Sequence, residues 1–351
     1  MAESDAMAAE LLEVSAASLA ASATNLLLDR LAQGERMLAS HAFGRWKSNL
    51  QQRLLELSIA IHEGAPQLFA GRVQWARTAF RARDVPEDEL RESLLCLREV
   101  LSNELPKSAQ VLALEYLDRG LSVFDQPAAE TTGLDPDSPH ANIALKYLVE
   151  VLEGNSRQAI DLIVGAMDDG LSVQDAYLHV LLPIQREVGR LWHLSEISVA
   201  EEHYVTATTE RAMSILTYRA VPKPANELSV VSAAVANNVH SIGVRTLADF
   251  FELDGWRSIC LGADAPTADI VQAVEDFQCD LLLLSASMST QLKTVRDVIA
   301  QVRQGTRADC KVLVGGSAFD DCSDIWQKLG ADGFAADATD AIAQGTRLLQ
   351  S

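Results

Sequence analysis

Five short apolar runs alternate with helical patterns in the last third of the chain, and this alternation constrains the fold most. The runs lie at about 228–236, 257–262, 280–285, 311–315 and 333–336. Strands of this kind, each followed by an amphipathic helix, are typical of parallel sheets that are covered on both faces. We therefore predict a doubly wound parallel sheet of flavodoxin-like strand order over residues 225–351.

Polar residues and glycines follow three of these runs. Open parallel sheets bind ligands beyond the carboxyl ends of their strands, so these positions are candidate ligand contacts. A lone histidine at such a position is typical of a structural residue. Whether it is instead a ligand contact depends on the spacing to the other polar residues and glycines. Gly243 is separated from Ser285 by 41 residues, and Ser287 from Gly315 by 27. The candidates are Asn238, His240, Ser241, Ile242, Gly243, Ser285, Ser287, Gly315 and Gly316.

This spacing resembles the D-x-H-x-x-G, S-x-L and G-G pattern of cobalamin-binding Rossmann-like domains. Two positions depart from it, because Asn238 stands where an acidic residue is usual and Ser287 where leucine is usual. The resemblance implies that His240 is the lower axial ligand of cobalt, in place of the cofactor's dimethylbenzimidazole. That base and its nucleotide tail would lie beside the serines and glycines. Asn238 would offer His240 an amide oxygen in place of a carboxylate.

Residues 139–220 show four helical stretches, at about 139–153, 155–169, 173–193 and 198–219, which predict a four-helix cap domain. Within it Trp192 is followed, after nine residues, by Glu202 and His203. This resembles the W-x9-E-H signature of the helical caps of light-sensing B12 proteins of the CarH type. The resemblance implies that Trp192 covers the upper face of adenosylcobalamin and that Glu202 contacts the adenosyl group. His203 would bind cobalt from above after light has released that group.

Residues 1–130 predict an all-helical domain, with helices at about 1–20, 25–38, 43–62, 66–82, 88–104 and 106–122. Its pattern resembles globin-like sensor domains through Trp75-Ala76-Arg77 and Val85-Pro86. The photocobilin subgroup of B12 photoreceptors holds a second, bilin chromophore on such a domain. The resemblance implies biliverdin near His62, Trp46, Trp75 and Arg72. Core tryptophans and a surface arginine in a dimerisation domain are the alternative. Residues 125–139 predict a linker.

Composition narrows the function. The chain has 29 basic and 49 acidic residues, a formal charge of −20, which argues against a nucleic-acid-binding surface. Five cysteines without metal spacing predict buried, reduced thiols. The N-terminus has no basic segment of a secretory signal, and we expect no apolar run to reach the roughly 18 residues of a membrane helix. We expect a cytoplasmic protein without membrane contact.

The combined motifs predict a B12-dependent photoreceptor, not an enzyme. Loss of the adenosyl group in light would rearrange domains or a homo-oligomer and so transmit a signal. One alternative is a corrinoid protein of a methyltransferase system, which predicts a carboxylate at position 238 and no W-x9-E-H. Another is a B12-binding antirepressor that acts on a transcription factor.

Overall fold

The computed structural model describes residues 3–33, 42–82, 85–126, 134–135, 137–322 and 324–350. Most of the predicted linker therefore lies outside the described residues. The chain divides into two compact units. The first is Met1–Ala129 with Met288–Lys293 and Ser317–Lys328, and the second is Glu130–Ser287 with Thr294–Gly316 and Leu329–Ser351.

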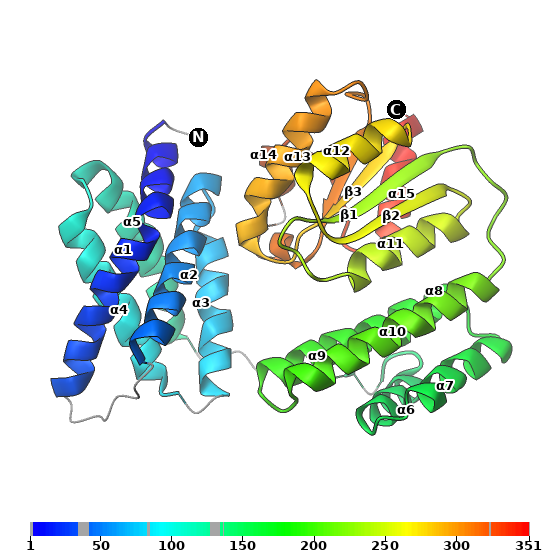
Figure 1. Ribbon diagram of the computed structural model, residues 1–351, viewed down its shortest axis with the longest axis horizontal. Coiled ribbons are helices and arrows are strands. Elements are labelled where there is room, and N and C mark those ends of the chain that lie inside the picture. Colours follow the sequence, from blue (N-terminus) through cyan, green and yellow to red (C-terminus); the bar gives the residue numbers. More distant parts are fainter. Residues whose placement is uncertain are drawn as a thin grey trace. The chain divides into compact units, whose positions relative to one another are not determined.

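Helices form the described part of residues 1–126, which belong to the first unit (Figure 1). They are α1 (Glu3–Gln33), α2 (Ala42–Glu63), α3 (Pro66–Arg81), α4 (Glu87–Glu104) and α5 (Lys107–Leu121), followed by the 3₁₀ turn η1 (Ser122–Asp125). Pro66 begins α3 and Pro86 caps α4, positions where the missing N–H group costs nothing. The predicted break after residue 20 is wrong: α1 continues through Thr24, whose hydroxyl bonds to the carbonyl of Ala20.

Helix α1 also corrects the expectation about membrane helices. Its segment Asp5–Ala32 is long and apolar enough, by length and composition alone, to cross a membrane. In the structure α1 packs against α2, α4 and α5, with Leu12, Leu19 and Leu27 buried. A core helix of a bundle needs the same apolar composition, so composition does not distinguish the two roles.

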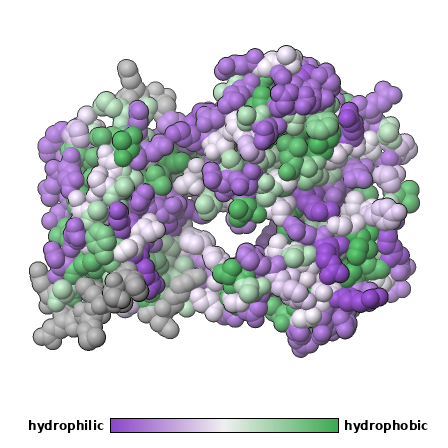
Figure 2. Space-filling view, viewed as in Figure 1, coloured by the Kyte–Doolittle hydropathy of each residue, from purple (hydrophilic) through white to green (hydrophobic). Residues whose placement is uncertain are grey.

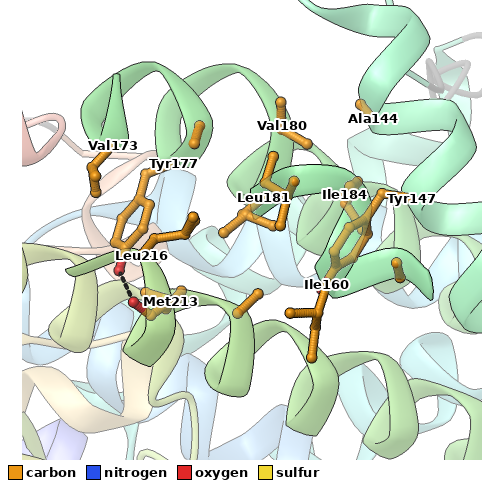
Figure 3. Close-up of a cluster of buried hydrophobic side chains, with 14 of the residues drawn as sticks. Ala144, Tyr147, Ile160, Val173, Tyr177, Val180, Leu181, Ile184, Met213 and Leu216 are labelled. Atoms are coloured by element: carbon orange, nitrogen blue, oxygen red, sulfur yellow. Dashed lines mark hydrogen bonds between the residues drawn. The ribbon is translucent and has the colours of Figure 1, made fainter. Parts of the chain in front are cut away.

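The second unit begins with the helical cap. It comprises α6 (Ala141–Leu152), α7 (Ser156–Asp168), α8 (Val173–Ala176), the π-helical turn η2 (Tyr177–Leu181), α9 (Leu182–His193) and α10 (Val199–Arg219). The four predicted helical stretches are confirmed. In the π turn the N–H of Leu182 donates to the carbonyl of Tyr177, five residues back, immediately before Pro183, which has no N–H. Figure 3 shows the apolar core, in which Tyr147 and Tyr177 are fully buried.

The sheet follows. Its strands are β1 (Ser229–Val235), β2 (Arg257–Ala265), β3 (Leu281–Ser285), β4 (Lys311–Gly315) and β5 (Gly333–Phe334), in the order β2-β1-β3-β4-β5. All neighbouring strands are parallel. This is the predicted flavodoxin-like order, with a switch point between β1 and β3.

Helices cover both faces of this sheet, α11 and α15 on one face and α12 and α13 on the other (Figure 1). The helices are α11 (Ile242–Leu253), α12 (Thr267–Asp276), α13 (Leu292–Gln304), α14 (Ile325–Leu329) and α15 (Ala338–Gln350). Short 3₁₀ turns, η3 (Ser289–Gln291) and η4 (Ser317–Phe319), follow β3 and β4. Under α11 and α15 an apolar cluster includes Val230, Phe251 and Leu283.

Hydrophilic residues occupy much of the face drawn in Figure 2, and hydrophobic residues form separate patches. All five cysteines are unpaired, and four of them are buried. Cys260 is exposed on β2, an edge strand, so the expectation of buried thiols is wrong for this residue. A strand at the edge of a sheet is less covered than a central one, so a cysteine in an edge strand can be exposed although the strand is apolar.

Candidate functional site

Asn238 lies at the switch point of the sheet. It follows β1 and is fully buried, and its amide Nδ2 donates to the backbone oxygen of Ser285, at the end of β3, over 3.1 Å. The site predicted from three separate sequence motifs therefore has a physical link between two of them. The carboxyl ends of β1 and β3 meet where a ligand of this class of sheet binds.

The same amide fixes the ring of His240. Because Nδ2 of Asn238 faces a carbonyl, its Oδ1 must face the histidine, and Oδ1 lies 2.9 Å from His240 Nδ1 and 3.3 Å from the backbone N of His240. An amide oxygen can only accept, so Nδ1 carries a proton, and in the neutral imidazole the lone pair is then on Nε2. His240 is exposed, so this lone pair belongs to an accessible side chain. A metal-binding histidine has this arrangement.

Ser241, Ile242 and Gly243 begin α11. The hydroxyl of Ser241 donates to Glu210 Oε1 of α10 over 2.5 Å, which ties the histidine loop to the cap. Glu210 is not among the candidates predicted from the sequence, although polar residues at 202, 206, 210 and 214 recur every four positions and so share one face of α10. A side chain added at Gly243 would meet no atom outside its own helix within 4 Å, so the surface beside His240 is open there.

The remaining sheet positions have structural reasons of their own. Gly316 has a φ of +100°, and a Cβ there would lie 2.3 Å from the carbonyl oxygen of Ala286. At Gly315 a Cβ would lie 2.9 Å from the oxygen of Ala335. The chain's own backbone therefore requires both glycines, whether or not a ligand also passes them. Ser285 is buried at the end of β3, and Ser287 is half-buried two residues later.

The cap motif forms a small polar network. Glu202 Oε2 lies 2.7 Å from His203 Nδ1, and its Oε1 accepts from the hydroxyl of Thr206 over 2.9 Å. Gln185 of α9 accepts from Thr206 and donates to Thr209, a chain that the sequence analysis missed. With Nδ1 bound to a carboxylate, the mostly exposed His203 also keeps Nε2 for another partner. Trp192 is half-buried on α9.

The four candidate bilin contacts each have a protein partner or an exposed face. Trp46 packs on Phe80 with ring centroids 5.6 Å apart, and His62 Nδ1 lies 3.1 Å from Glu63 Oε1. The backbone oxygen of Arg72 accepts from the buried Arg53. Trp75 is 44% exposed, so the alternative that both tryptophans are core residues is wrong for Trp75. Biliverdin remains a prediction.

The arrangement defines a class of protein. A parallel sheet with an accessible histidine at its switch point, adjoined by a helical cap, is a cofactor-binding α/β module. Residues 228–344 match a model of the B12 binding domain, and residues 145–217 match a second model with the same description.

Curated relatives point the same way. The chain is 32% identical over 122 residues to dimethylamine corrinoid protein 3 of Methanosarcina acetivorans, covering 34% of this chain and 56% of the relative. It is 30% identical to dimethylamine corrinoid protein 3 of Methanosarcina mazei, covering 34% of this chain and 71% of the relative. The chain thus spans a little over half the length of the first of these relatives.

A solved structure shares the fold. The monomethylamine corrinoid protein of Methanosarcina barkeri has a TM-score of 0.51 and 22% identity, over 60% of this chain and 99% of that one. The chain therefore belongs to the B12-binding proteins, with a helical cap and a Rossmann-like B12 domain. Its cofactor is a corrinoid.

Proposed function

We propose that the chain holds a corrinoid beside the cap, with His240 as the lower ligand of cobalt. The single observation that carries this is the orientation of His240, whose Nδ1 is held by the buried amide of Asn238. A neutral imidazole with a free Nε2 lone pair fits a cobalt ion. Asn238, Ser285 and the open surface at Gly243 would hold and admit the cofactor.

We propose further that the chain carries an alkyl group for a partner protein and is not itself an enzyme. The cobalt of a bound corrinoid supplies an axial position that can accept and release such a group. The similarity to dimethylamine and trimethylamine corrinoid proteins supports a corrinoid carrier of a methyltransferase system. This reading is favoured over the light sensor. Two features of the sequence do not agree with the corrinoid carrier. The carrier predicts a carboxylate at position 238, where this chain has an amide, and it predicts no W-x9-E-H pattern, which this chain has.

A specific observation keeps the light sensor as a second candidate. Glu202 holds His203 by Nδ1 and leaves Nε2 for another partner, as Asn238 does for His240. Two histidines that are each held by Nδ1 and can bind through Nε2 suit a cofactor that exchanges an upper organic ligand for an imidazole. This second function requires adenosylcobalamin, and its output would be a change in the cap. An antirepressor would share that sensor and differ only in its partner.

Cobalt ligation is tested on the full chain loaded with cob(II)alamin. Electron paramagnetic resonance should show superhyperfine splitting from one nitrogen. His240→Ala should remove the coupling to a protein nitrogen, while His203→Ala should keep it. Splitting that survives His240→Ala, with uniformly ¹⁵N-labelled protein still changing the pattern, would assign the ligand to another residue.

The two candidate functions are separated by light. The chain is loaded in the dark with methylcobalamin or adenosylcobalamin, illuminated, and followed by absorption spectroscopy. A light sensor should give a stable product from adenosylcobalamin whose spectrum depends on His203. A carrier should bind methylcobalamin, lose the methyl group to an added thiol nucleophile faster than free methylcobalamin does, and behave identically in the His203→Ala variant.

A further inference from the structure

A row of polar contacts joins the cap to the helix that follows His240. Ser241 donates to Glu210, and Arg245 donates to Ser214 Oγ over 3.0 Å. The next residue in this series, Asp249, accepts from the hydroxyl of Tyr177 over 2.7 Å. Ser241, Arg245 and Asp249 are spaced by four residues, so they share one face of α11. We call these three contacts the cap–α11 seam.

Tyr177 is the buried end of the seam. Its hydroxyl lies 2.7 Å from Asp249 Oδ2, 2.8 Å from Thr217 Oγ1 and 3.0 Å from the carbonyl oxygen of Met213. Figure 3 shows the ring reaching from the π turn toward Met213. The hydroxyl has one proton, and the carboxylate is its strongest acceptor. Burial raises the pKa of Asp249 and of Tyr177. One side chain thus joins the π turn, α10 and α11.

Tyr177 and Trp192 lie far apart on one helical segment of the cap. The stretch α8, η2 and α9 is continuous in sequence, and Trp192 lies 15 residues after Tyr177 on it. At 1.5 Å per residue the two are separated by about 22 Å. Tyr177 therefore fixes one end of a helical segment whose other end carries the tryptophan of the cap motif.

We infer that Tyr177 is a positioning residue, which through Asp249 holds the cap on α11 and so governs how readily an axial ligand reaches the upper face of the corrinoid. This rests on the proposed function, because it needs the corrinoid between cap and sheet. Tyr177 touches neither the cofactor nor the exchanging ligand in this role. Its effect is transmitted by the angle at which the cap lies on the helix that begins beside His240.

The chain offers a matched control in Tyr147. Both tyrosines are fully buried in the cap core, and both hydroxyls are hydrogen-bonded. The hydroxyl of Tyr147 bonds to Thr209 Oγ1, 3.4 Å away within the cap. Replacing either tyrosine by phenylalanine removes one buried hydroxyl from the same core, but only Tyr177→Phe removes a bond to α11.

The test uses the full chain loaded with hydroxocobalamin. Replacement of the upper water by azide is followed by stopped-flow absorption, and the lower ligand is checked by paramagnetic resonance after reduction to cob(II)alamin. Tyr177→Phe should speed azide entry about tenfold, the factor that corresponds to about 1.4 kcal/mol, with nitrogen splitting unchanged. Tyr147→Phe should leave the rate as in the wild type.

Two variants of the partner complete the test. Asp249→Asn keeps an acceptor for the tyrosine hydroxyl, so its rate of azide entry should stay close to that of the wild type. Asp249→Leu has no acceptor there, and azide should enter it as fast as it enters Tyr177→Phe. Equal azide rates in wild type and Tyr177→Phe, or the same acceleration in Tyr147→Phe, would overturn the inference and leave corrinoid binding intact. A wild-type chain that fails to bind hydroxocobalamin would instead remove the proposed function and the inference together.

Discussion

At the scale of single residues, Asn238 organises the candidate site. Its nitrogen donates to the backbone of β3 and its oxygen orients the ring of His240, so one buried amide links the ends of two strands and orients the imidazole. A carboxylate could accept from the histidine but could not donate to Ser285. Asparagine at position 238, where an acidic residue is usual, therefore suits the neighbouring carbonyl of Ser285, which needs a donor.

The first prediction concerns this amide. Asn238→Ala should lower the free energy of unfolding by about 1–3 kcal/mol, because the buried carbonyl of Ser285 loses its donor. Urea unfolding of the cofactor-free chain measures this. Asn226→Ala is the matched control: Asn226 is exposed and its side chain accepts from the nearby N–H of Leu228, so little change is expected. Equal losses in the two variants would contradict the role given to Asn238.

At the scale of elements, the loops after β1 and β4 use glycine for different reasons. Gly316 has a positive φ and lies against the backbone of Ala286, whereas Gly243 stands in the first turn of α11 beside open space. The first glycine serves the fold. The second leaves room next to His240, where we propose that the corrinoid binds.

The second prediction separates these roles. Gly316→Ala should lower the free energy of unfolding by about 1–3 kcal/mol through backbone strain. Gly243→Ala should raise it by about 0.5–1 kcal/mol, because alanine favours a helix, and should weaken hydroxocobalamin binding. Urea unfolding and absorption titration measure the two effects. A Gly243→Ala chain that binds the corrinoid as tightly as the wild type would place the cofactor elsewhere.

At the scale of the whole molecule, the buried carboxylate between the cap and the sheet links stability to pH. Burial raises the pKa of Asp249 above its ordinary value, although its bond from Tyr177 opposes this. The folded chain then holds the proton more tightly than the unfolded chain does. The contribution of Asp249 to stability is therefore greatest below the ordinary carboxyl pKa of about 4 and falls as pH rises through the higher folded value.

The third prediction follows from this sign. Asp249→Asn removes the titrating group but keeps an acceptor for Tyr177, so the variant should gain stability relative to wild type as pH rises from about 4 toward neutrality. Urea unfolding of both chains at several pH values in this range gives the difference. A difference in unfolding free energy that does not change with pH would show that Asp249 titrates as it does in the unfolded chain.

The sequence by itself determined the parallel sheet, the four cap stretches and the presence of His240 at a strand end. Hydrophobic periodicity and motif spacing are local along the chain, and strands of a doubly wound sheet have few alternative orders. Boundaries agreed to within a few residues in the sheet, as for β1, predicted at 228–236 and found at Ser229–Val235.

Only the tertiary structure decided which polar residues meet. Ser241 and Glu210 are 31 residues apart, Tyr177 and Asp249 are 72 apart, and no sequence pattern pairs them. The break expected within α1 and the burial expected for Cys260 failed for the same reason. Both depend on neighbours from other elements: apolar packing holds α1 as one helix, and the place of β2 at the sheet edge leaves its cysteine uncovered. Local sequence sets an element's type, whereas long-range packing sets its surroundings.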